Sequence, residues 1–198
     1  MFSQFLSLFI QLFFLLTPFF ALTMFLTYTE NMSKSQQIIL SIKTTIAILI
    51  ICYVIIFLGK KIFEIFGITV DAFRIGAGAI LFLSAVDLVR GKASATKSED
   101  VNDIAVVPLA TPIIVGPATI GTLLVMGSGF TDLKSMVPLL FAMLAAVGLL
   151  SAMLFSSAWI NKVLGRRGLV ILSRLTGLIL AALSAQMIFI GIAAFLKV

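Results

Sequence analysis

Long apolar runs alternate with short polar connectors along the whole chain. Six runs approach or exceed the roughly 20 residues that a helix needs to cross a bilayer. They cover residues 2–26, 38–58, 70–89, 104–126, 136–159 and 169–196. The pattern predicts an all-α polytopic membrane protein with a single transmembrane domain over residues 1–198. Polar connectors are expected at 28–37, at Gly59-Lys60-Lys61, at 91–103, at 127–134 and at 161–168.

The two halves of the chain resemble each other on either side of the most polar connector. Several residues of the first half recur in the second half in the same order, as in a repeat with loop insertions. Arg74, Leu83-Ser84-Ala85 and Gly91 recur as Arg174, Leu183-Ser184-Ala185 and Gly191; Gly67 recurs as Gly165, and Thr17-Pro18 recurs as Thr111-Pro112. We therefore expect three-helix repeats at 1–90 and 104–198, joined by a linker loop at 91–103.

An odd number of spans in each repeat makes the second repeat enter the membrane from the opposite side. The expected architecture is therefore two inverted three-helix repeats, with helices 1 and 4 broken by their prolines. This arrangement is common among secondary transporters, whose solute site lies near the midplane where the broken helices meet.

Composition narrows the class of protein further. The chain is 61% hydrophobic and 11% charged, with a mean hydropathy of +1.23, which is too apolar for a soluble domain of this size. The net charge of +6 is spread through the connectors, so no basic patch predicts a nucleic-acid partner. Histidine is absent and Cys52 is the single cysteine, so no metal site or internal disulfide is expected.

The distribution of positive charge predicts the topology. Nine of the fourteen lysines and arginines fall on one predicted face of the membrane: Lys34, Lys43, Arg90, Lys92, Lys97, Lys162, Arg166, Arg167 and Arg174. This face is expected to be cytoplasmic, with both termini outside. Arg74 and Arg174 lie at helix starts, where they are expected to act as interfacial anchors.

The run at 107–118 contains three of the five prolines, although it is apolar enough to lie in a membrane. Proline breaks or kinks a helix, and Gly116-Pro117 is typical of a helix restart. The first N–H groups of the new helix, at Ala118, Thr119 and Ile120, would form a receptor for a carboxylate. Thr111 and Pro112 are expected beside it. The alternative is a kinked structural helix.

Thr17-Pro18 predicts the matching break in the first span. The break would leave the carbonyl of Phe14 without a donor, so that it could complete the site or coordinate a cation. A simple proline kink is the alternative for this position as well.

Two further polar residues lie within apolar helices. Asp87 is a candidate for coupling to H⁺ or Na⁺, since carboxylates inside membranes often mark ion pathways; its position near the end of the span and next to Arg90 favours instead an interfacial carboxylate paired with Arg90. Gln186 is a candidate to bind the solute or to tie helices together. Three rows of small residues are expected to be packing surfaces and permit a homo-oligomer: Gly76-Ala77-Gly78, Gly148/Ala152/Ser156 and Gly177/Ala181/Ala185.

No catalytic or nucleotide-binding motif occurs in the sequence, so we expect neither an enzyme nor a cofactor. The leading hypothesis is a secondary transporter of a small solute. Its partners would be that solute and membrane lipid. The alternatives are a non-transporting membrane subunit or scaffold and a drug exporter.

Three motifs resemble those of the MarC family of bacterial inner-membrane proteins. They are the runs 107–112 with 116–118, 72–78, and 174–182 with Gln186 and Gly191. The resemblance implies a multi-pass protein of the bacterial inner membrane. Some relatives are described as transporters of small neutral amino acids, which implies a neutral amino acid as the solute and transport by alternating access.

One stretch departs from the pattern of that family. Relatives usually carry Asp-Pro in span 1, followed by a run resembling Gly-Asn-x-Pro, whereas this chain has Thr17-Pro18 followed by Phe19-Phe20-Ala21-Leu22-Thr23. If the missing side chains bind solute or a coupling ion in relatives, the departure implies a difference in solute or in coupling.

Overall fold

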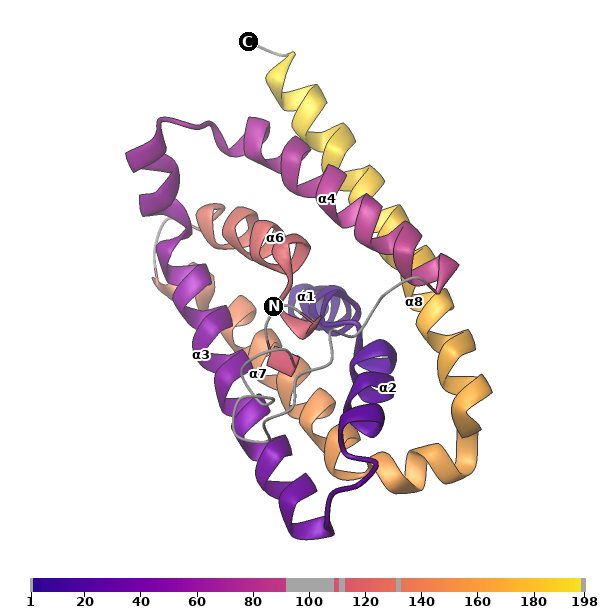
Figure 1. Cartoon of the computed structure of the whole chain (residues 1–198). Coiled ribbons are helices and arrows are strands. Elements are labelled where there is room, and N and C mark those ends of the chain that lie inside the picture. Colours follow the sequence, from indigo (N-terminus) through magenta and orange to yellow (C-terminus); the bar gives the residue numbers. More distant parts are fainter. Residues whose placement is uncertain (1, 92–108, 111–112, 131–132, 197–198) are drawn as a thin grey trace.

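The computed structural model describes residues 2–91, 109–110, 113–130 and 133–196, and all regular secondary structure in these residues is helical (Figure 1). The helices are α1 Phe2–Leu15, α2 Pro18–Tyr28, α3 Lys34–Phe66, α4 Val70–Arg90, α6 Pro117–Ser128, α7 Leu133–Phe155 and α8 Ser157–Phe195. The expected all-α class is confirmed.

Five stretches are long and apolar enough to cross a membrane: Ser3–Tyr28, Lys34–Leu58, Val70–Arg90, Lys134–Phe155 and Ser157–Phe195. They correspond to five of the six expected spans. The expected span 104–126 is described only in part, and its second half forms the shorter apolar helix α6. The expected linker at 91–103 lies outside the described residues, apart from Gly91.

Two of the expected connectors are wrong, because the chain stays helical there. α3 continues through Gly59-Lys60-Lys61 to Phe66, and α8 runs through 161–168 with a kink at Gly165. Lysine is a good helix former, and a single glycine costs a helix only about 1 kcal/mol. The chain turns instead at Gly67 and bends at Gly165, where φ is 62° and 65°; glycine adopts such angles without a steric cost.

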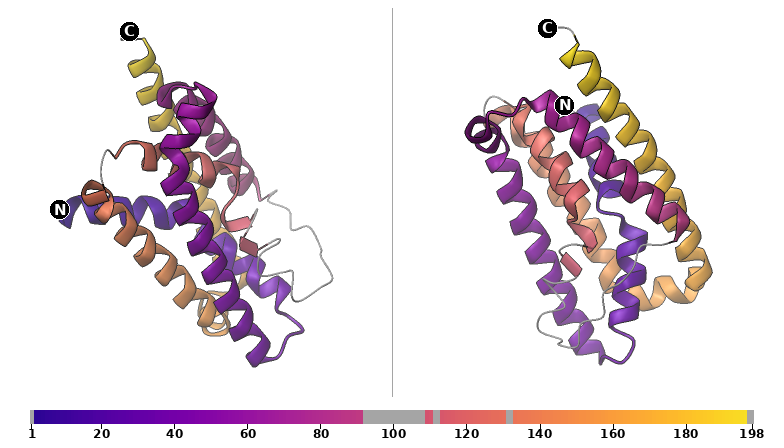
Figure 2. Two further views of the ribbon diagram at one scale, coloured as in Figure 1. Left: turned by 90° about the vertical axis from the view of Figure 1, so that its left-hand side faces the viewer. Right: turned by 45° about the horizontal axis from the view of Figure 1, so that its top comes forward.

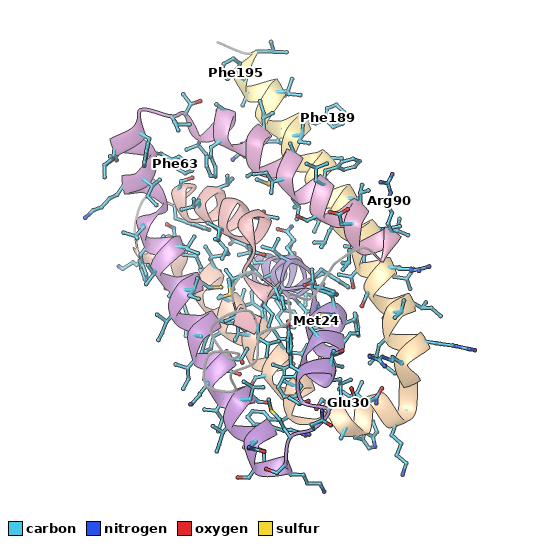
Figure 3. All side chains as sticks on the ribbon, viewed as in Figure 1. Met24, Glu30, Phe63, Arg90, Phe189 and Phe195 are labelled. Carbon is cyan, nitrogen blue, oxygen red and sulfur yellow. The ribbon has the colours of Figure 1, made fainter. Side chains whose placement is uncertain are left out.

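α3 shows how the bundle separates an inner face from an outer face. One row of α3, at most 2% exposed, consists of Leu40, Thr44, Ile48, Cys52 and Ile56. A second row, 45–58% exposed, consists of Ile38, Ile42, Ile46, Ile50 and Val54. Both rows repeat every four residues, as one face of a helix does. The outer row is entirely apolar and therefore suits contact with lipid. Phe189 and Phe195 of α8 likewise point away from the bundle (Figure 3).

α4 and the second half of α8 lie side by side and antiparallel (Figure 1). Glycines bring the two backbones together: a Cβ on Gly177 would lie 2.9 Å from the Ala85 carbonyl oxygen, and one on Gly191 would lie 2.9 Å from that of Asp71. Small residues permit such close approach in membranes. Gly76 and Gly148, from the predicted packing rows, have open space where a Cβ would stand, so they make no close contact within the described part of the chain.

The broken helices lie inside this frame. α6 contacts α3 and α4, α1 contacts α7, and α2 contacts α8 (Figure 1). Figure 2 shows α1 and α2 pointing in different directions from the break between them. Leu16 beside the first break and Ile114 and Val115 beside the second are at most 1% exposed. The described residues beside both breaks therefore lie inside the bundle.

Gly177→Ala is expected to destabilise the protein by about 1–3 kcal/mol, the usual cost of overpacking. The added methyl group would press on the backbone of α4, which cannot move without disturbing its other contacts. Thermal unfolding of the full chain in detergent would show a lower Tm. Gly76→Ala is the matched control, because alanine fits there and favours a helix by about 1 kcal/mol. Equal Tm values for the two variants would contradict the close contact.

Candidate functional site

The first break is centred on Thr17, which precedes the Pro18 that begins α2. Thr17 has φ 46° and ψ 56°, the left-handed conformation, which is rare for a β-branched residue and costs about 1–3 kcal/mol. Its Oγ1 is buried and has no hydrogen-bond partner among the described residues. The prediction that the Phe14 carbonyl lacks a donor is wrong, because the Thr17 N–H donates to it at 2.9 Å.

The second break precedes α6. The N–H of Val115 donates to the carbonyl of Ala110 at 2.8 Å, a five-residue span wider than an α-helical turn. Gly116 is then extended, with φ −84° and ψ 178°, and Pro117 is the first residue of α6. The predicted helix restart at Gly116-Pro117 is confirmed.

The first turn of α6 leaves backbone donors without helical partners. The N–H of Ile120 donates to the Gly116 carbonyl at 2.9 Å, so its predicted availability is wrong. The N–H groups of Ala118 and Thr119 precede the first helical hydrogen bond and have no partner within the helix. No side chain caps the helix start. These two N–H groups are therefore the donors that α6 offers.

Both breaks border one cavity of about 220 Å³, which we call the first cavity. The first break and α2 contribute Leu15, Thr17 and Phe20; the second break and α6 contribute Ile113, Ile114, Gly116, Ala118 and Thr119; α4 and α8 contribute Leu81, Ser84, Asp87, Leu88 and Leu180. The structure thus brings together five residues that the sequence singles out: Thr17, Asp87, Gly116, Ala118 and Thr119.

Thr119 links the two breaks across the first cavity. Its side chain is 4% exposed, and its hydroxyl lies 3.3 Å from the Ile114 carbonyl oxygen and 3.5 Å from the Leu15 carbonyl oxygen. A hydroxyl has one hydrogen to donate, so it can satisfy one carbonyl at a time. This arrangement leaves an acceptor at the edge of the cavity.

Asp87 places a carboxylate at the edge of the first cavity and is itself exposed. The favoured interpretation, a pair with Arg90, is wrong within the described part of the chain, where Asp87 makes no ion pair. Arg90 is exposed at the end of α4 (Figure 3). The ion pair that α4 does form joins Arg74 Nη1 to Asp71 Oδ1 at 3.0 Å.

A second cavity, of about 380 Å³, lies towards the other end of α4. Its polar lining residues are Gln11, Arg74, Thr122 and Gln186. Leu15 and Leu81 border both cavities. Gln186 is therefore separated from the predicted site residues that line the first cavity; along α8 it lies six residues beyond Leu180, which lines that cavity.

The remaining predicted site residues do not line the first cavity or cannot be placed. Pro18 is buried as the first residue of α2. Thr111 and Pro112 lie outside the described residues, and of Pro117 only the backbone is described. Sequence reasoning missed Gln11 and treated Arg74 as an interfacial anchor, although the Arg74 side chain is only 23% exposed. A polar Gln11 within an otherwise apolar run was the available signal.

The helices and the enclosed breaks define a multi-pass integral membrane protein. The chain belongs to the MarC family: the model of MarC family integral membrane proteins matches residues 2–196. It is 34% identical over 197 residues to a UPF0056 membrane protein of Methanocaldococcus jannaschii, with 96% of each chain covered. It is 30% identical over 201 residues to one of Bacillus subtilis, covering 97% of this chain and 95% of the relative. It is 29% identical over 203 residues to one of Escherichia coli, covering 96% and 93%. No solved structure matches the chain.

Thr17→Val is expected to leave the free energy of unfolding unchanged or to raise it by about 1–2 kcal/mol. Valine keeps the shape of the side chain and removes a buried hydroxyl that has no partner, a group that costs about 1–3 kcal/mol. Thr29→Val is the control, because the buried Thr29 hydroxyl donates to Phe25 at 2.8 Å and its loss should destabilise. Denaturation in detergent measures both; an equal loss in the two variants would contradict an orphaned Thr17 hydroxyl.

Proposed function

We propose that this protein is a secondary transporter that carries a small neutral amino acid by alternating access, and that it is a carrier and not an enzyme. The observation that supports this most directly is the meeting of both helix breaks at the first cavity. The N–H groups of Ala118 and Thr119 lie at the positive end of α6, which favours a carboxylate. The carboxylate of Asp87 suits the ammonium group of the solute or a coupling H⁺ or Na⁺.

The size of the first cavity favours a small solute. At about 220 Å³ it is smaller than the roughly 300–1,000 Å³ of sites that hold drug-sized ligands. Among the described residues, Phe20 is its one aromatic lining residue, so this part of the wall differs from the aromatic wall expected for drug efflux. An amino acid with a short side chain fits these dimensions better than a drug does.

The inverted repeat is part of the same proposal. Gly67 and Gly165, equivalent positions in the two halves, both have a positive φ, of 62° and 65°, although ψ is 23° at Gly67 and 167° at Gly165. At the α4–α8 contact Gly78 faces Ser184, while Gly177 faces Ala85. Residues of α8 at this contact lie 100 positions after their counterparts in α4, as Arg174 does after Arg74. On this spacing Gly78 corresponds to the position next to Gly177, and Ser184 corresponds to the position next to Ala85, so each contact is the counterpart of the other. A two-fold axis between α4 and α8 would produce this reciprocity, which supports inverted three-helix repeats.

The position of the two cavities supports alternating access. They lie towards opposite ends of α4 and share Leu15 and Leu81 as wall residues, which suits a path closed on one side at a time. The excess of lysine and arginine favours a cytoplasmic location for the C-terminal end of α4. The first cavity would then face the cytoplasm, with both termini outside the bacterial inner membrane.

Purified protein in proteoliposomes is expected to exchange labelled glycine, alanine or serine faster than empty vesicles do. Leucine and phenylalanine should be exchanged more slowly than alanine, because their larger side chains leave the least spare room in the first cavity. Exchange against unlabelled solute measures this directly. Folded protein that moves none of these solutes would contradict the proposal and would favour a non-transporting membrane subunit.

Asp87→Asn is expected to abolish the response of solute uptake to an imposed pH gradient, if Asp87 carries the coupling proton. In the unmodified protein one pH unit supplies about 1.4 kcal/mol, enough for roughly ten-fold accumulation when one proton accompanies each solute. Glu64→Gln is the control, since Glu64 is exposed on α3 and lines neither cavity. An unchanged pH response in Asp87→Asn would exclude this role.

A further inference from the structure

Arg74 occupies an unusual position for a cation in this chain. Its side chain is 23% exposed and lines the second cavity, among apolar residues such as Leu8, Val125 and Ile190. A guanidinium stays charged in such a place. An ionisable side chain within a membrane helix that faces a cavity commonly marks a path for ions or solutes.

The local partners of Arg74 leave most of its hydrogen-bonding capacity unused. Nη1 donates to Asp71 Oδ1 at 3.0 Å, whereas a guanidinium has five N–H donors. Among the described residues, Arg74 makes no other hydrogen bond, and the amide of Gln186 makes none. The Gln11 amide donates only to Ser7, at 3.4 Å. The second cavity therefore combines a guanidinium that has unused N–H donors with the amides of Gln11 and Gln186, which keep hydrogen-bonding capacity for a ligand.

The equivalent arginine of the second half does not share this environment. Arg174 is exposed, and its guanidinium lies near Gly91, where a Cβ would stand 3.5 Å from Nη2. It lines neither the first nor the second cavity. A role as an interfacial anchor explains Arg174, but it does not explain why Arg74 faces a cavity.

We propose that the second cavity is a recognition site for the carboxylate of the solute, in which Arg74 binds the carboxylate and Gln11 and Gln186 hydrogen-bond to it. A planar guanidinium can donate two parallel hydrogen bonds to the two oxygens of a carboxylate. Asp71 offsets part of the charge of Arg74, so the site favours a zwitterion or a monocarboxylate over a dianion such as phosphate. This inference rests on the proposed function, because it assigns the group by which the transported solute is selected.

Protection of Arg74 from an arginine-specific reagent tests binding without requiring transport. The full chain in detergent is treated with phenylglyoxal, and modification of each arginine is followed by peptide mass spectrometry. Propionate and L-alanine are expected to slow the modification of Arg74, and L-alaninamide, which has no carboxylate, is not. Modification of Arg174 serves as the internal control and should not change. Equal modification of Arg74 with and without propionate would overturn the inference, as would stronger protection by inorganic phosphate.

Transport kinetics provide the second test. Arg74→Gln is expected to raise the half-saturating concentration of L-alanine about ten-fold, consistent with the loss of hydrogen bonds to a charged group, while Arg174→Gln leaves it unchanged. Arg74→Lys keeps the charge without the planar fork, so it should lie between Arg74→Gln and the unmodified protein. Tm values identify any variant that fails to fold, and the protection assay on the unmodified protein does not depend on these variants.

The two tests separate the inference from the proposed function. Transport of alanine with no protection of Arg74 would overturn the carboxylate site and leave the transporter proposal intact. Protection of Arg74 in a protein that moves no solute would support the binding site and contradict transport.

Discussion

A helix that breaks inside a bilayer leaves backbone N–H and C=O groups without partners, and hydrocarbon cannot supply them. This chain meets the constraint twice, at Thr17-Pro18 and at Gly116-Pro117. Both breaks are consequently enclosed by other helices, with Leu16 and Val115 fully buried beside them. The long helices α3, α4, α7 and α8 form the enclosure, and their outer faces carry the apolar side chains that suit lipid.

The enclosure depends on close packing where lipid provides no hydrophobic drive to bring helices together. Glycines at the α4–α8 contact let the backbones approach within van der Waals distance. Such a rigid frame can hold Thr17 in a strained conformation with its hydroxyl unpaired. Strain of this kind persists only where the surroundings impose it, and here it coincides with the wall of the first cavity.

The two cavities differ in chemistry as well as in position. The first cavity has backbone donors at the start of α6 and a carboxylate at its edge, while the second has a guanidinium and two amides. Leu15 and Leu81 contribute to the walls of both. Under the transport proposal, a small zwitterion moving along α4 would find a partner for its carboxylate on either side of these leucines.

The sequence by itself determined the helical membrane class, five of the spans and the restart at Gly116-Pro117, because apolar runs and proline act locally. Its motifs also indicated the family, and the spacing of small residues indicated the role of Gly177 in packing. The sequence also singled out Thr17, Gly116, Ala118 and Thr119, which are close to the breaks along the chain. Only the tertiary structure decided that Asp87 joins them, and that Gln186 and Arg74 belong to a second cavity. Which side of a helix faces which neighbour depends on contacts between distant segments, and those contacts leave no local pattern in the sequence.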